Sequence, residues 1–201
     1  MTMSARQFAL PLMLSLALPL GGCISIGGGK PPATLMTLDS SESLAVGQVQ
    51  DSSKSSTITI GVPSVPQALA TNRVPVTSGG TAIAYVKDAA WVEGPSRLFG
   101  RLLADTITAR TGRVVLSNRQ SQADPGAQLT GDLRMFGIDE PTGDAVVVYD
   151  AVLSRQDGGV FEKQRFEARV PVGTVDATTV GPALNSAANQ VAAKVADWVG
   201  R

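Results

Sequence analysis

Apolar and polar residues alternate in several short segments after residue 57, which is typical of strands with one buried face. We predict strands at 57–61, 81–87, 127–138, 145–154 and 160–172. In the third of these, Leu129, Leu133 and Met135 are expected to share one face. Ser78-Gly79-Gly80 predicts a turn, and Asp157-Gly158-Gly159 predicts that the last two strands form a hairpin.

Two other segments repeat apolar residues every three or four positions, as helices with one buried side do. The first should begin at Gly94-Pro95-Ser96 and end at Thr111-Gly112, and the second should follow Gly181-Pro182. Their apolar stripes comprise Leu98, Leu102, Leu103 and Ile107 in the first helix and Leu184, Ala187, Ala188, Val191, Val195 and Trp198 in the second. We therefore predict an α/β two-layer sandwich, with a mostly antiparallel or mixed sheet and two main helices packed on one face.

The segments before residue 77 are less regular. Residues 33–38 alternate as a short first strand would, and the serine-rich residues 39–56 are interpreted as a solvated loop. An alternative is that a flexible tether extends as far as Ser56. Residues 62–76 contain three prolines, which favour sheet edges or turns because proline cannot donate a ladder hydrogen bond.

The first 22 residues are typical of an export signal. Arg6 precedes an uncharged apolar run at 8–20, which is too short to cross a bilayer as a helix and has the length of a secretory signal core. We expect residues 1–22 to be a lipoprotein signal peptide that is removed, 23–32 to be a lipidated tether, and 33–201 to be a single periplasmic domain.

The chain has a single cysteine, Cys23. The stretch Leu20-Gly21-Gly22-Cys23 resembles a bacterial lipobox, which implies cleavage before Cys23 and attachment of acyl chains such as palmitate to that residue. The alternative is an ordinary signal peptide followed by a buried thiol. Ile24 stands where an aspartate would signal inner-membrane retention, so the resemblance implies an anchor at the periplasmic face of the outer membrane.

The composition excludes several function classes. Seventeen basic and seventeen acidic residues cancel, so no net charge attracts the protein to nucleic acid. The absence of histidine excludes imidazole catalysis and histidine-ligated metals, and one cysteine cannot form an internal disulfide or a multi-cysteine zinc site. Neither a phosphate-binding P-loop nor a G-x-S-x-G motif is present. We therefore expect a protein that is not an enzyme and needs no cofactor or metal.

A few residues are candidates for function. The proline-rich segment is the best candidate for a partner surface, through Val62, Pro63, Val65 and Pro66, and Trp91 could anchor a partner as well. The competing interpretation places Trp91 in the core and treats the prolines as protection of an edge. Paired carboxylates at Asp139, Glu140 and Asp144 could serve acid/base chemistry, although turns carry such residues for solvation.

The order of these features resembles the ABC-type transport auxiliary lipoproteins. The resemblance is carried by the lipobox, ATLMTLD at 33–39, TITIGVPSVPQALATNRVPV at 57–76, and WVEGPSRLFGRLLADTITAR at 91–110. It implies an accessory role in intermembrane lipid transport, with an MCE-domain protein and an inner-membrane ABC permease and ATPase as partners. Self-association into a ring or dimer is left open. The alternatives are a cell-envelope hydrolase that uses the carboxylates, and an envelope-assembly scaffold.

Overall fold

The computed structural model describes residues 34–123, 126–155 and 159–201. The predicted signal peptide, the tether and Cys23 lie outside these residues. The described elements, in chain order, are β1 (Thr57–Ile60), η1 (Gln67–Leu69), β2 (Arg73–Ser78), β3 (Ala82–Ala90), α1 (Pro95–Thr111), β4 (Val114–Leu116), η2 (Gln120–Gln122), β5 (Ala127–Asp139), β6 (Asp144–Ser154), β7 (Phe161–Pro171) and α2 (Val180–Val199).

All seven of these strands belong to one mixed sheet organised around β5. One edge of β5 pairs antiparallel with β6 along its whole length, and β6 pairs in turn with β7. The other edge is shared: β1 pairs with its beginning, an isolated bridge from Ser64 reaches Asp132, and β2 pairs with its end. Strands β4 and β3 then extend the sheet beyond β1 and β2.

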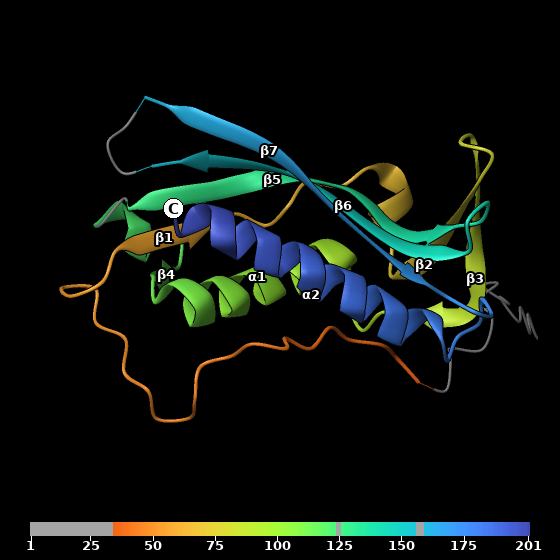
Figure 1. Cartoon of the computed structure of the whole chain (residues 1–201), viewed down its shortest axis with the longest axis horizontal. Helices are drawn as coiled ribbons and strands as arrows, with labels where there is room; N and C mark the ends of the chain where they lie inside the picture. The colour runs from red at the N-terminus through yellow and green to blue at the C-terminus, as the bar shows by residue number, and fades with distance from the viewer. Residues whose placement is uncertain (1–33, 124–125, 156–158) are drawn as a thin grey trace, which may run out of the picture. The chain divides into compact units, whose positions relative to one another are not determined.

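The two helices lie together on one face of the sheet (Figure 1). The sheet residues that face them include Leu129, Phe136, Val147 and Tyr149, and each of these is completely buried. The predicted stripes of α1 and α2 are buried against this face, and Trp198 of α2 packs near Phe166 of β7. The predicted two-layer α/β sandwich is thereby confirmed. Neither helix among the described residues is long and apolar enough to cross a membrane.

The helix ends follow from local chemistry. Pro95 occupies the first turn of α1, where its missing N–H costs nothing, and Gly112 ends the helix at φ 68°, which glycine adopts without strain. Helix α2 begins at Val180, just before Gly181-Pro182. The carboxylate of Asp176 accepts hydrogen bonds from the backbone N–H groups of Thr178 and Thr179, and so orders the turn that leads into this helix.

One prediction within β5 is wrong. Leu129 and Leu133 face the helices, but the register with β6 shifts between Leu133 and Met135. The irregularity places Met135 opposite Val148, outside the core, and turns Phe136 inward. Alternation along a strand identifies the buried face only until a bulge reverses it.

Two other expectations need correction, and one strand was not predicted. The predicted strand at 33–38 is reduced, among its described residues, to a bridge from Met36 to Trp91. Pro75 lies inside β2, between β3 and β5, rather than at an edge. The pairing of β2 with β3 is irregular between Arg73 and Pro75, so the sheet accommodates the missing N–H there. Strand β4 was not predicted, because only three residues form it.

The shared edge of β5 requires a close approach at Gly137. A Cβ atom at this position would lie 2.4 Å from the Pro75 carbonyl oxygen and 2.8 Å from its ring. Real Cβ atoms do not approach backbone oxygen this closely, so only glycine lets β2 and β5 pair here.

We expect Gly137→Ala to destabilise the fold by about 1–3 kcal/mol or more, because neither Pro75 nor the β5 backbone has room to move. Gly173→Ala is the matched control, since a Cβ there has no neighbour within 4 Å. Denaturant unfolding of both variants measures the difference. Equal midpoints for the two variants would contradict the steric account.

Candidate functional site

Residues 34–56, which we call the strap, form no helix or strand beyond the bridge at Met36. In Figure 1 the strap runs in orange along the helices, on the side away from the sheet. The interpretation of 39–56 as a loop is therefore confirmed. The alternative of a tether reaching Ser56 is wrong for the part that is bonded to the helices.

The side chain of Asn189 on α2 binds the strap backbone as another strand would. Its Oδ1 atom accepts a hydrogen bond from the N–H of Ser41 at 2.8 Å, and its amide nitrogen donates to the carbonyl of Asp39 at 2.9 Å. One helical turn earlier, Asn185 accepts from the N–H of Asp39 at 2.9 Å. Two asparagines spaced by four thus satisfy strap backbone groups that no ladder could satisfy.

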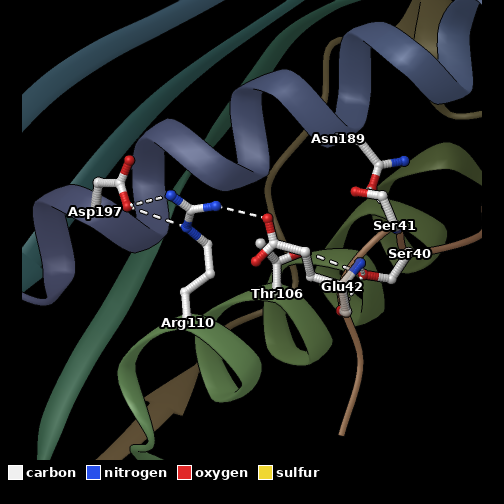
Figure 2. Close-up of polar contacts among 7 residues, drawn as sticks. All are labelled: Ser40, Ser41, Glu42, Thr106, Arg110, Asn189 and Asp197. Atoms are coloured by element: carbon white, nitrogen blue, oxygen red, sulfur yellow. Dashed lines mark hydrogen bonds and ion pairs between the residues drawn. The ribbon is translucent and has the colours of Figure 1, made fainter.

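Arg110 joins three segments at the other end of this contact (Figure 2). From α1 its guanidinium donates to Glu42 on the strap at 2.5 Å and to Asp197 on α2 at 2.7 Å. These hydrogen bonds, first that to Asp197 and then that to Glu42, raise the pKa of Arg110 above its ordinary value. A planar guanidinium suits this task because its donors point in several fixed directions.

Ser40 adds a contact between these two anchors, with its hydroxyl 3.3 Å from that of Thr106 on α1. The strap is therefore held to both helices by side chains that are far away in sequence. Sequence reasoning missed this site. Its one local signal is a pair of asparagines on the polar side of a helix otherwise rich in alanine and valine.

The predicted partner surface is divided by the fold. Val62 is 66% exposed and Pro66 is exposed, whereas Pro63 is buried and Val65 packs partly against the core. Between them, Ser64 accepts from the N–H of Leu133 at 2.8 Å and donates its own N–H to Gly131 at 3.0 Å. The segment is thus an interrupted strand on the edge of β5, with alternate residues facing outward.

Trp91 lies in the core, where it is 1% exposed. Its ring meets that of Phe136 edge to face at 5.4 Å, and Phe136 continues through Phe99 to Tyr149. The indole N–H and the Tyr149 hydroxyl are buried without a hydrogen-bond partner among the described residues. Burial raises the pKa of Tyr149, so this hydroxyl stays protonated. The aromatic row is apolar in character and joins the sheet to α1.

The carboxylates proposed for acid/base chemistry lie at the turn between β5 and β6. Asp139 and Asp144 are cross-strand neighbours, but Asp139 accepts a hydrogen bond from Arg169 at 2.9 Å. Glu140 is exposed. Across the described residues, no group of three or more acidic, cysteine or histidine side chains is arranged to hold a metal ion.

An ion pair with two hydrogen bonds, one more than Asp139 makes with Arg169, lies on the sheet face opposite the helices. Asp150 of β6 is mostly buried and accepts two hydrogen bonds from Arg165, its cross-strand neighbour on β7, at 2.6 and 2.7 Å. These bonds hold the pKa of Asp150 below its usual value, with smaller contributions from the nearby charges of Arg134 and Lys163. The pair fixes the register of β6 and β7 on their polar face.

Arg110→Gln should loosen the strap, because it removes both ion pairs while α1 keeps its buried stripe. Hydrogen exchange is expected to accelerate at residues 39–44 and to change little in β5 and β6. Arg119→Gln is the control, since this exposed arginine has no ion pair among the described residues. Unchanged exchange in the strap would show that the asparagines alone hold it.

Asp150→Asn should lower stability at neutral pH and lose its effect in acid. The folded-state pKa of Asp150 is depressed, so its contribution is complete above the unfolded pKa of about 3.9 and disappears as pH falls through the folded value. Unfolding free energies of wild type and variant should therefore differ by a constant amount from pH 5 to 8 and converge below about pH 4. A difference that persists in strong acid would contradict this assignment.

Comparison with known proteins identifies one matching family model and two solved structures with a similar fold. The family model of the ABC-type transport auxiliary lipoprotein component matches residues 37–196. The crystal structure of protein XCC0632 from Xanthomonas campestris, of family DUF330, superposes with a TM-score of 0.65 at 16% identity, covering 83% of this chain and 94% of that one. The crystal structure of an uncharacterized protein gives a TM-score of 0.61 at 15% identity, with coverages of 71% and 92%.

A search of curated proteins returned no match. The two structural similarities, both below 25% identity, show a shared fold. The family match is more informative, because it begins within the strap, includes every strand and α1, and extends into α2 as far as Ala196. The chain therefore belongs to the ABC-type transport auxiliary lipoprotein component family.

Proposed function

We propose that this protein is a non-enzymatic auxiliary subunit of an ABC transport system that moves lipids between the two membranes of the envelope. Its partners are an MCE-domain protein and an inner-membrane permease and ATPase, and its own anchor lies in the periplasmic face of the outer membrane. The observation that carries the proposal is the family match over residues 37–196, which includes the strap as well as the sandwich.

The proposed anchor agrees with the way the strap is attached. Cys23 lies eleven residues before Thr34, the first described residue, and a fully extended chain of this length spans at most ~36 Å. Because the strap is bonded to both helices, a lipidated Cys23 would keep the domain near its membrane. A subunit that receives or passes on lipid needs such a position.

The state of the carboxylates supports a role without catalysis. Asp139 is engaged by Arg169, and Asp150 is engaged by Arg165. Both pairs link neighbouring segments of the sheet, and the bonds from Arg165 lower the pKa of Asp150, which makes that carboxylate a poor proton acceptor. We propose that partner contact uses the exposed part of the proline-rich segment, Val62 and Pro66, while Pro63 and Trp91 support it from the core.

Isolation of the tagged full-length protein from solubilised membranes tests the partners. We expect an MCE-domain protein and ABC transporter subunits to co-purify, and Val62→Asp to reduce their recovery several-fold if the exposed segment forms the contact. Val160→Asp, which changes a similarly exposed valine immediately before β7, is the control. Recovery of cell-wall enzymes alone would refute the proposal.

Cys23→Ser should abolish incorporation of labelled palmitate and move the protein from the outer-membrane fraction to the soluble periplasm. The physical reason is that several acyl chains are needed for stable anchoring, at about 0.8 kcal/mol per buried CH₂ group. Density-gradient fractionation measures the distribution. A serine variant that remained with the outer membrane would show that some other contact holds it there.

A further inference from the structure

A groove of about 700 Å³ opens where the described chain begins. Its wall on the strap side is formed by Leu35 and Met36, and its other walls come from the end of β3 and the first turn of α2. Leu35 is 51% exposed although it is large and apolar. Leu35 and Met36 therefore give the hollow an apolar wall, as small-molecule sites commonly have.

The backbone builds this groove at two special positions. Gly181 lets α2 approach the strap so closely that a Cβ atom there would lie 2.9 Å from the sulfur of Met36. On the opposite side, Asp88 has φ 57°, a left-handed conformation within β3 that aspartate tolerates better than most residues. Its strand bulges there, and Asp88 lines the groove.

The charges at the groove are of one sign. Asp39 and Asp88 both line it, and neither carboxylate has an ion pair among the described residues. No lysine or arginine is found among the described residues that line it. Asp176, which accepts hydrogen bonds from the backbone N–H groups of Thr178 and Thr179 immediately before α2, places a further negative charge near the start of this helix. The groove therefore favours a ligand with an apolar portion and a cationic group.

The groove lies close to the predicted lipid anchor, so the membrane is the expected source of such a ligand. Thr34 lies in its lining, so the path from Cys23 to the groove is at most ~36 Å of extended chain. If Cys23 carries the anchor, as the proposed function requires, the membrane surface lies within that reach. Lipid is then the apolar molecule present at the highest local concentration.

We propose that this groove binds a membrane lipid whose headgroup carries an ammonium group, with an acyl chain against Leu35 and Met36 and the ammonium between Asp39 and Asp88. The inference rests on the proposed function and names the class of lipid that this subunit would handle. An anionic lipid is disfavoured by both carboxylates.

Photolabelling of the lipidated full-length protein in phosphatidylcholine vesicles tests this. The vesicles contain a small fraction of either phosphatidylethanolamine or phosphatidylglycerol that carries a photoreactive acyl chain. We expect labelling at the strap peptide containing Leu35 and at the first turn of α2, at least five-fold stronger from phosphatidylethanolamine. Leu35→Glu should abolish the labelling, the double change Asp39→Asn and Asp88→Asn should remove the headgroup preference, and the control Val160→Glu should change neither.

Equal labelling from the two lipids, or labelling that Leu35→Glu leaves unchanged, would overturn the proposal. Displacement of the label by a basic apolar peptide, without any dependence on the lipid headgroup, would assign the groove to a protein partner and overturn it too. If the transporter subunits co-purify but the groove is not labelled, the groove assignment alone fails. If Cys23→Ser leaves the protein on the membrane and no transporter subunit co-purifies, the proposed function fails.

Discussion

The sheet depends on how the second edge of β5 is divided among three segments. The chain pairs first through β1, then through the single residue Ser64, and finally through β2. Between these contacts it leaves the sheet twice, and Pro63 and Pro66 stand where it leaves, since they have no N–H to place in a ladder. Gly137 completes the arrangement by admitting the Pro75 carbonyl. The proline-rich segment is therefore part of the sheet's construction as much as a surface.

The sequence predicted the elements whose signals are local. Helix α1 has proline at its start, glycine at its end and an unbroken apolar stripe between them, and the structure has it at those bounds. The predictions failed where pairing between strands determines which side chains are buried and which strands lie inside the sheet. The alternation of residues in β5 gives no sign of the irregularity before Met135. Proline is rare in interior strands, so the sequence around Pro75 does not predict the interior strand in which it lies.

The contacts of the strap could not be predicted from the sequence either, because they join residues that are far apart along the chain. Its backbone bonds go to Asn185 and Asn189, about 150 positions along the chain, and no pattern within residues 34–56 indicates those partners. Its charges are no more informative, because Glu42 is one of several polar residues there and gains its role only from the position of Arg110. By contrast, the predicted leader and the predicted lipidation of Cys23 depend only on a local motif, because a processing enzyme would bind that segment as an extended sequence.

The strap also gives the domain a definite mechanical response. Tension applied at its N-terminal end would load the Met36 bridge first, then the asparagine contacts, and then the ion pairs of Arg110, one after another rather than all together. Contacts that are loaded one at a time separate at a lower force than contacts that are loaded together. Once released, residues 37–56 could extend to ~65 Å before the tension reached β1. A domain built in this way can follow a partner that moves relative to the membrane without unfolding.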